Sequence, residues 1–122
     1  MDILIVDDSR ATRESLVALL REQPEVNSVR EAASAAQAIT ILGQAPPDVV
    51  VLDLQMNGPQ GFRVLEAAKR MGLRAPVVIV FTSYATGRYR LRAQQLGADF
   101  FFDKASGVRN LLGAIGGASA VQ

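Results

Sequence analysis

The chain has 122 residues, of which 49% are hydrophobic and 20% charged, and this size and apolar content fit one globular domain rather than two. Its net charge of +1 is too small for sequence-independent binding to nucleic acid, and the lack of Cys and His excludes disulfides, thiolate zinc sites and imidazole bases. No apolar run approaches the roughly 18 residues of a membrane span, so we expect a cytoplasmic protein without membrane contact.

Short, continuous runs of apolar residues, rich in β-branched or aromatic types, recur along the chain. Runs of this kind predict strands that are buried on both faces of a sheet. They occupy residues 3–6, 49–52, 77–81 and 100–102. One more strand, the second in chain order, is expected at residues 26–32. There Val26 and Val29 do not alternate cleanly, and this weaker pattern favours a place at the edge of the sheet.

Between the strands, apolar residues recur at the spacing of one helix face, and each such stripe predicts a helix that packs on the sheet. In chain order, the inward positions are Thr12, Leu16, Leu19 and Leu20; Ala35, Ala38, Ile39 and Leu42; Val64, Leu65 and Ala68; Ala85, Tyr89, Ala93 and Leu96; and Val108, Leu111, Leu112 and Ile115. The third helix is expected around residues 61–71, and Gly43 and Gly97 are expected to end the second and fourth helices.

Strict alternation of five strands with five helices predicts an α/β domain built around a parallel sheet. Crossovers between parallel strands are right-handed, which places helices on both faces. We therefore expect a doubly wound, five-stranded parallel sheet of the flavodoxin-like (αβ)5 type, with strand order 2-1-3-4-5. The domain is expected to span residues 1–115, and residues 116–122, rich in Gly, Ala and Ser, are expected to form a flexible C-terminal tail or the start of a linker.

Polar side chains that directly follow the predicted strands are candidates for a binding or catalytic site. In an open parallel sheet, ligands bind at the carboxyl ends of the strands, near the point where the strand order reverses. The residues at these ends are Asp7 and Asp8, Asp53, Thr82 and Ser83, and Asp103 and Lys104. Because the first and third strands are neighbours in the expected order, Asp7, Asp8 and Asp53 should face one another.

Three facing carboxylates repel one another unless a cation compensates for their charge. Oxygen ligands without His or Cys favour Mg²⁺ over zinc or iron, and Mg²⁺ usually leaves one carboxylate free for another role. Asp53, alone at the end of a central strand, is the best candidate for a nucleophile that forms an aspartyl phosphate. Lys104 would neutralise phosphate oxygens, and Thr82 would donate its hydroxyl.

Each of these residues also has a purely structural interpretation. The acids after the first strand, or Ser9, can cap the following helix. Thr82 and Ser83 can act as turn or cap residues, and a lone Lys104 is most often solvated. Asp53 has few structural reasons to follow a buried apolar run. The joint pattern at four strand ends favours a functional site over these separate explanations.

Four segments of the chain together resemble a response-regulator receiver domain, and the resemblance covers essentially the whole chain. They are residues 3–8, 49–56 (VVVLDLQM), 81–83 and 97–104. Paired acids, a central Asp, a Thr and a Lys recur in this order in the family, so the combination is specific.

The resemblance implies a role for each site residue. Asp53 would be the phosphoacceptor, and Thr82 and Lys104 would contact the phosphoryl group. Phe101, three residues before Lys104, matches the switch aromatic that moves together with Thr82. The implied ligands of Mg²⁺ are Asp7, Asp8, Asp53 and the backbone carbonyl of Gln55.

The chain departs from the family pattern at three places. Ala105 follows Lys104 where the family usually has Pro, often after a cis peptide bond, which costs about 2.5 to 4 kcal/mol before a non-proline residue. Residues 57–60 (NGPQ) replace the usual Pro and acidic residue of the loop beside Asp53. Phe101 lacks the hydroxyl of the commoner Tyr, so its burial needs no hydrogen-bond partner. We therefore expect both loops to differ from the family pattern.

The sequence supports two functions of different classes. The first is a response regulator of a two-component or phosphorelay system, in which a histidine kinase or phosphotransfer protein donates a phosphoryl group to Asp53 with Mg²⁺. The second is a receiver-like adaptor that signals without phosphate, suggested by Ala105 and the altered loop. A phosphatase would need a substrate-enclosing cap, and an FMN carrier would need a phosphate loop where Asp7 and Asp8 stand. We therefore do not expect an enzyme that acts on external substrates.

The predicted fourth helix has a basic face, on which Leu91 falls outside the inward stripe. Its basic residues are Arg88, Arg90 and Arg92. This face is either a solvated surface or, with the fifth strand and fifth helix, a docking surface for an acidic protein partner or a second receiver.

On the last helix, Gly113 and Ala114 are expected on the outer side, where small residues permit close packing. No helix-turn-helix follows, so we expect no direct contact with nucleic acid.

Overall fold

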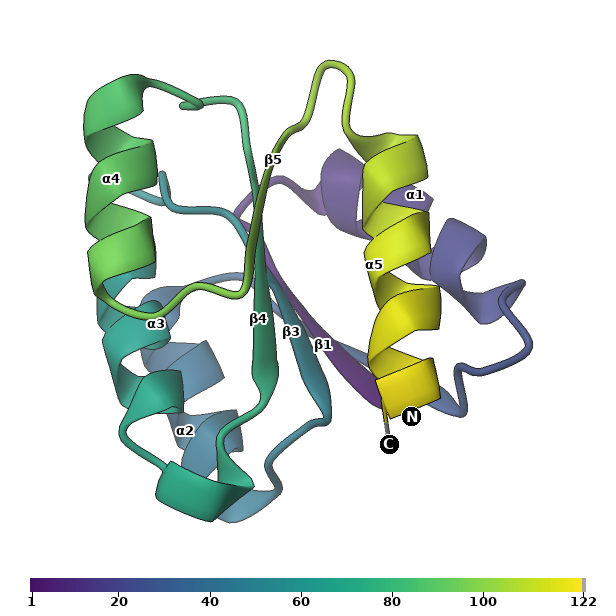
Figure 1. The fold of residues 1–122 in the computed structure, drawn as a ribbon. Coiled ribbons are helices and arrows are strands. Elements are labelled where there is room, and N and C mark those ends of the chain that lie inside the picture. Colours follow the sequence, from purple (N-terminus) through teal and green to yellow (C-terminus); the bar gives the residue numbers. More distant parts are fainter. Residues whose placement is uncertain (122) are drawn as a thin grey trace.

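The computed structural model describes residues 1–121, in which a five-stranded parallel sheet carries helices on both faces (Figure 1). The strands are β1 (Asp2–Val6), β2 (Ser28–Ala32), β3 (Val49–Leu52), β4 (Val77–Thr82) and β5 (Phe100–Asp103). They lie in the order β2-β1-β3-β4-β5, and all neighbouring pairs are parallel. The doubly wound fold and its strand order are confirmed, as is the edge position of β2.

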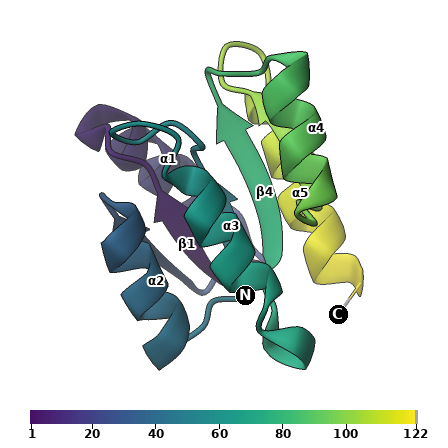
Figure 2. The ribbon, with the colours of Figure 1, turned by 90° about the vertical axis from the view of Figure 1, so that its left-hand side faces the viewer.

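The helices form two layers, one on each face of the sheet. One layer contains α1 (Arg10–Arg21) and α5 (Val108–Val121); the other contains α2 (Ala35–Gln44), α3 (Gly61–Lys69) and α4 (Gly87–Gln95), with the short 3-10 helix η1 (Gly72–Arg74) after α3. Figure 2 views the molecule from the side of the second layer and shows α2, α3 and α4 in front of the sheet. The central strands are therefore covered on both faces.

Alternate residues of each central strand enter two separate cores. On β1, Leu4 and Val6 join the core under α2, α3 and α4, whereas Ile3 and Ile5 join the core under α1 and α5. All four side chains are fully buried. Because successive side chains of a strand point to opposite faces, a strand covered on both faces needs an apolar residue at every position. This requirement explains the continuous apolar runs of the sequence.

Three side chains of β5 and α5 differ from the predicted burial. Phe100 is 39% exposed, because β5 forms an edge of the sheet. Val108 is 41% exposed, because it begins α5 beyond the last residue of β5. Ala114 is buried rather than outward, since it shares a helix face with the buried Leu111 and Ile115. Of the two small residues expected outside, only Gly113 is exposed.

Several element boundaries also differ from the prediction. α2 does not end at Gly43 but continues one residue further, since a helical Gly costs only about 1 kcal/mol. α4 begins after Thr86, whose hydroxyl caps it, so Ala85 lies outside the helix. α5 remains helical beyond residue 115, through Val121, so the helix does not end at the predicted domain boundary. Where a tail or linker starts stays a prediction.

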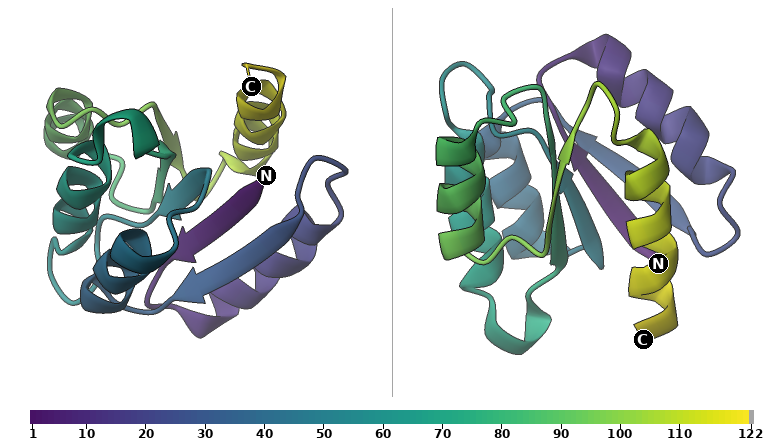
Figure 3. Two further views of the ribbon diagram at one scale, coloured as in Figure 1. Left: turned by 90° about the horizontal axis from the view of Figure 1, so that it is seen from below. Right: turned by 45° about the horizontal axis from the view of Figure 1, so that its top comes forward.

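The two chain ends lie away from the carboxyl ends of the strands. The N-terminus and the last turn of α5 are both at the lower end of the sheet, as Figures 1 and 3 show. The opposite end, at which the chain leaves β1, β3, β4 and β5, is formed only by loops and helix starts. Within residues 1–121, no helix has the length and apolar character needed to cross a membrane.

Candidate functional site

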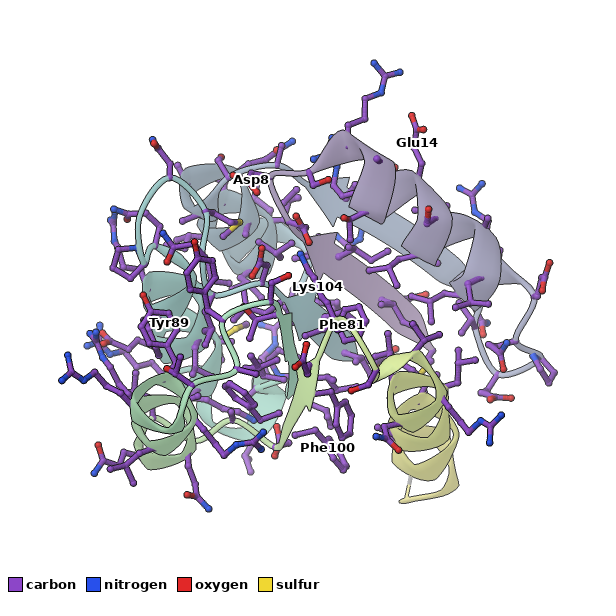
Figure 4. All side chains as sticks on the ribbon, turned by 90° about the horizontal axis from the view of Figure 1, so that it is seen from above. Asp8, Glu14, Phe81, Tyr89, Phe100 and Lys104 are labelled. Atoms are coloured by element: carbon purple, nitrogen blue, oxygen red, sulfur yellow. The ribbon has the colours of Figure 1, made fainter. Side chains whose placement is uncertain are left out.

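The carboxyl ends of the strands place the predicted site residues at one edge of the sheet, seen from above in Figure 4. These residues are Asp7 and Asp8 after β1, Asp53 after β3, Thr82 at the end of β4, and Lys104 after β5. Lys104 lies near the centre of this edge, and Asp8 lies on the side where the chain enters α1. The parallel register therefore gathers residues that are up to 97 positions apart in the sequence.

The carboxylates of Asp7, Asp8 and Asp53 form one cluster. An oxygen of each lies within 4.8 Å of an oxygen of the others. Asp7 and Asp53 are only 2% and 7% exposed, whereas Asp8 faces solvent. This set offers only hard oxygen donors and leaves one side open to water, which is the environment that Mg²⁺ prefers. The residues present therefore fit the magnesium site expected from the sequence.

Lys104 is the cation that partly balances this cluster. Its Nζ atom lies 2.5 Å from Asp7 Oδ2 and 3.2 Å from Asp53 Oδ2. Burial by itself lowers the pKa of Lys104, but the hydrogen bond to Asp7 and the charges of Asp53 and Asp7 outweigh it and raise that pKa above its ordinary value. Lys104 is therefore held firmly in its charged form.

Asp53 is a buried carboxylate with donors on both oxygens. Its Oδ1 atom accepts hydrogen bonds from the Thr82 hydroxyl at 2.8 Å and from the Gln55 backbone N–H at 3.2 Å. Burial raises the pKa of Asp53, and Asp7 adds to this effect, while Lys104 and Thr82 oppose it without cancelling it. Lys104 and Thr82 thus compensate the negative charge of Asp53 only in part, which suits a carboxylate that binds further ligands.

The turn into α1 fixes the position of Asp7. Its Oδ1 atom accepts a hydrogen bond from the Ser9 backbone N–H at 2.8 Å. Ser9 in turn caps α1 by accepting a hydrogen bond from the Thr12 N–H at 3.2 Å. Ser9 thus takes the capping role that the sequence also allowed for Asp7 and Asp8, and both carboxylates remain at the strand end.

Arg13 supports the same turn and was missed by the sequence reasoning. Its Nη1 atom donates to the backbone oxygen of Asp7 at 2.8 Å, and its Nε atom donates to Glu31 Oε1 at 3.2 Å. The side chain is only 14% exposed. These contacts tie the end of β1 to the end of β2. The only signal in the sequence was an arginine in the first helix, which is too common to interpret.

Thr82 is fully buried and serves Asp53 rather than a helix cap. Its hydroxyl donates to Asp53 and accepts a hydrogen bond from the Tyr84 backbone N–H at 3.2 Å. The capping role on α4 belongs to Thr86. Thr82 is therefore not a helix cap, but the bond from Tyr84 gives it the turn role that its residue type also allowed. Ser83, which is exposed, makes no hydrogen bond to the cluster among the described residues.

Gly61 permits a close approach behind Asp53. A Cβ atom at this position would lie 2.3 Å from the backbone oxygen of Asp53 and 2.4 Å from Cα of Leu54. The Gly61 N–H also donates to the backbone oxygen of Leu54 at 2.9 Å. The start of α3 is therefore packed directly on the backbone that carries the Asp53 side chain, and only glycine fits there.

Phe101 lies on β5 opposite Val80 and is partly buried against the core under α2, α3 and α4. The guanidinium carbon of Arg90 lies 4.5 Å from the centre of its ring, within the range of a cation–π contact. Among the described residues, no hydrogen bond or aromatic pair joins Phe101 to Thr82. Their coupling stays a prediction.

The two loops that depart from the expected pattern have ordinary local explanations. Peptide bonds in the described part of the chain are all trans, including the one between Lys104 and Ala105. Asp103 supports this loop, because its Oδ1 atom accepts a hydrogen bond from the Ala105 N–H at 2.9 Å. In the other loop, Asn57 and Gly58 have φ of 52° and 90°, a left-handed conformation that these two residue types adopt most easily.

A family model described as the response regulator receiver domain matches residues 3–116. The chain belongs to the response-regulator receiver family. The resemblance inferred from the motifs is therefore confirmed, and it extends over the sheet, both helix layers and the carboxylate edge. A receiver domain is a signalling module of two-component systems.

Relatives show how receiver domains are built into longer proteins. The chain is 36% identical over 98 residues to the sensory transduction protein LytT of Enterococcus faecalis, a match that covers 80% of this chain and 39% of LytT. It is 33% identical over 113 residues to a protein-glutamate methylesterase/protein-glutamine glutaminase of Rhodospirillum centenum, covering 92% of this chain and 29% of that protein. The chain therefore spans well under two thirds of these curated relatives.

One solved structure matches this chain over nearly the whole length of both proteins. The CheY-like response regulator receiver domain protein from Methanospirillum hungatei is 26% identical, with a TM-score of 0.86 over 98% of this chain and 93% of that chain. The agreement over nearly the whole of both chains is consistent with the observed strand order and helix layers.

Proposed function

We propose that this receiver domain accepts a phosphoryl group on Asp53 from a histidine kinase or a phosphotransfer protein, and that phosphorylation changes a partner-binding face. The buried carboxylate of Asp53 supports this most directly. It lies between the Thr82 hydroxyl, 2.8 Å from Oδ1, and the Lys104 ammonium, 3.2 Å from Oδ2. These two groups are suited to bind phosphoryl oxygens that arrive beside the carboxylate.

In the proposed reaction, an oxygen of Asp53 attacks the phosphorus atom of a phosphohistidine. The P–N bond breaks, the imidazole leaves, and the phosphoryl group is carried as an acyl phosphate. Lys104 neutralises oxygens of the incoming group, for which its raised pKa keeps it charged. Thr82 turns its hydroxyl from the carboxylate to a phosphoryl oxygen.

The proposed ligands of Mg²⁺ are Asp7, Asp8, Asp53 and the backbone carbonyl of Gln55. Lys104 offsets only one of the three carboxylate charges, so the cluster retains a place for a second cation. When bound, Mg²⁺ supplies positive charge that offsets the carboxylates and the phosphoryl oxygens. Binding without phosphate is expected to be weak, because water must complete the six-fold coordination.

The proposed output is a change in the face formed by α4, β5 and α5. A phosphoryl group adds about −1.5 to −2 charges at the strand ends. Withdrawal of Thr82 toward this group would free space that the Phe101 ring can occupy, and both residues lie on strands that border this face. Its exposed apolar side chains include Leu91 and Phe100, which are 56% and 39% exposed.

The same face is basic, which favours an acidic protein partner or a second receiver. Its arginines are Arg88, Arg90 and Arg92, and none of them pairs with a carboxylate among the described residues. We propose that nucleic acid, membranes and external substrates are not ligands of this domain. The methylesterase activity named for one relative belongs to a protein of which this chain covers 29%.

An adaptor that signals without phosphate is the second candidate. The ion pair between Lys104 and Asp7, at 2.5 Å, favours it because the pair neutralises part of the acidic cluster without a metal or phosphoryl group. A receiver that never accepts phosphate needs this ion pair at all times. A receiver that is phosphorylated needs it only while Asp53 carries no phosphoryl group.

Intact-mass measurement after incubation with Mg²⁺ and acetyl phosphate separates the two candidates. We expect a single phosphoryl adduct that disappears in Asp53→Asn and with EDTA. Asp103→Asn is the matched control, since this aspartate also stands at the carboxyl end of a strand but lies outside the carboxylate cluster, and it should retain the adduct. An unmodified wild type, both with acetyl phosphate and with a phosphorylated donor protein, would overturn the proposal and favour the adaptor.

A further inference from the structure

Gln55 is held from two directions. Its backbone N–H donates to Asp53 Oδ1 at 3.2 Å. Its side-chain Oε1 atom accepts a hydrogen bond from the hydroxyl of Tyr89, on α4, at 3.1 Å. The two residues are 34 positions apart, so this bond links the loop after β3 directly to the partner-facing helix. Nothing in the receiver motifs of the sequence singles out Tyr89.

The Tyr89 ring is itself fixed by aromatic neighbours. It meets the edge of Phe62 with ring centres 5.2 Å apart and an interplanar angle of 71°, and it stacks on Tyr84 at 6.0 Å and 27°. Phe62, on α3, is fully buried in the core under α2, α3 and α4. Figure 4 shows Tyr89 on the α4 side of the strand-end edge. Because packing already orders the ring, its hydroxyl loses little further freedom when it binds Gln55.

Two separate series of contacts connect Tyr89 with Asp53, the proposed phosphoacceptor. From Tyr89, ring stacking leads to Tyr84, whose N–H bonds the Thr82 hydroxyl, and this hydroxyl donates to Asp53. From Tyr89 in the other direction, the phenol bonds Gln55, whose N–H also donates to Asp53. The helix α4 therefore reaches Asp53 by two routes, and only one of them passes through Thr82.

We propose that Tyr89 is a positioning residue for Gln55 and, through it, for the metal-binding side of the Asp53 site. This inference rests on the proposed function, in which the Gln55 backbone carbonyl is a ligand of Mg²⁺. A carbonyl ligand binds a cation best when its peptide is already oriented, because ordering it during binding costs free energy. Tyr89 and Asp53 together hold that peptide at its side chain and at its N–H.

The consequence is a thermodynamic link between α4 and the metal. A partner that shifts α4 and breaks the bond to Gln55 lowers the affinity of the site for Mg²⁺, and Mg²⁺ must oppose that shift by the same factor. This link does not require Phe101 to move. It gives the basic helix a direct connection to the chemistry at Asp53.

Two conservative variants and one control test the positioning role. Tyr89→Phe removes the hydroxyl but keeps the ring against Phe62 and Tyr84, and Gln55→Met keeps the length and backbone carbonyl but removes the acceptor. Each should weaken Mg²⁺ binding about three- to tenfold, measured without a phosphodonor from amide chemical shifts. The double variant should bind no more weakly than either single variant. Tyr84→Phe, which removes the neighbouring hydroxyl, should stay within about twofold of wild type.

The outcomes separate this inference from the proposed function. Unchanged Mg²⁺ affinity in Tyr89→Phe, effects that multiply in the double variant, or a wild type that does not respond to Mg²⁺ would each overturn the positioning role. Unchanged amide shifts in the central strands verify that the variants fold. Intact mass with acetyl phosphate is read in parallel: an unphosphorylated wild type with the expected affinity pattern rejects only the proposed function, and a phosphorylated wild type with an indifferent Tyr89 rejects only the positioning role.

Discussion

The two ends of the parallel sheet use charged residues for different purposes. At the amino end, aspartate side chains join neighbouring elements by hydrogen bonds. Asp99, before β5, accepts hydrogen bonds from Lys69 Nζ at 2.6 Å and from the Val78 N–H at 2.8 Å. Asp2 accepts a hydrogen bond from the Ser28 hydroxyl at 2.8 Å, which joins the starts of β1 and β2. These side chains fasten neighbouring elements together.

At the carboxyl end, the charges are not balanced. The cluster of Asp7, Asp8 and Asp53 has one lysine, Lys104, within ion-pair distance among the described residues. Its two buried carboxylates have hydrogen-bond partners, but their charge is only partly offset. Hydrogen bonds alone therefore do not distinguish a structural charge from a functional one. Burial of an incompletely balanced charge does, because Asp7 and Asp53 are buried whereas Asp2 and Asp99 are exposed.

The largest effect should come from filling the close approach behind Asp53. Gly61→Ala places a Cβ atom 2.3 Å from a backbone oxygen, so the backbone must move. We expect the free energy of unfolding to fall by about 2 to 4 kcal/mol in urea denaturation. Gly43→Ala is the matched control in α2, where nothing lies within 4 Å, and it should gain about 0.5 to 1 kcal/mol. Equal effects in the two variants would contradict the packing argument.

Neutralising one aspartate at each end should change stability in opposite directions. Asp99→Asn loses the ion pair with Lys69, whose two side chains are partly exposed, and is expected to lower the free energy of unfolding by about 0.5 to 1 kcal/mol. Asp53→Asn removes a poorly compensated buried charge and should raise it by about 0.5 to 1 kcal/mol at pH 7, a gain limited by the loss of the ion pair with Lys104. Urea denaturation in EDTA measures both, and a loss of stability in Asp53→Asn would refute the charge imbalance.

Mg²⁺ should stabilise only a protein with an intact carboxylate cluster. At a concentration about five times its dissociation constant, it is expected to add about 1 kcal/mol to the free energy of unfolding. Asp8→Asn should leave the metal-free stability nearly unchanged, because Asp8 is exposed, but should lose most of this gain. Thermal unfolding with and without Mg²⁺ tests this. Full stabilisation in Asp8→Asn would show that the metal binds elsewhere.

The smallest effect concerns pH. Burial raises the pKa of Asp53 in the folded state above its ordinary value of 3.8. The folded protein therefore holds this proton more tightly than the unfolded chain, so stability from this group is present below pH 3.8 and is lost as pH rises through the folded pKa. The stability difference between Asp53→Asn and wild type in EDTA should shrink steadily from pH 7 toward pH 4. A difference independent of pH would argue against a buried, charged Asp53.

The aspartates and Lys104 could be located from the sequence because each directly follows a recognisable strand. β1, β3 and β4 are buried on both faces, so their apolar runs are continuous and their ends are sharp. β5 was located equally well but its burial was not, since a run of three aromatic residues looks the same in the centre and at the edge of a sheet. The exposed position of Val108 was missed for a similar reason, because helical spacing does not show where the sheet below the helix ends.

By itself, the sequence determined the alternation of strands and helices, the strand ends and the types of group gathered there, because these depend on local patterns of apolar and polar residues. Only the tertiary structure decided the contacts between distant elements. Arg13, on α1, contacts Asp7 and Glu31. Tyr89, on α4, contacts Gln55 in the loop after β3. Such contacts depend on how helices are placed on the sheet, to within the length of a hydrogen bond, and no spacing along the chain encodes that distance.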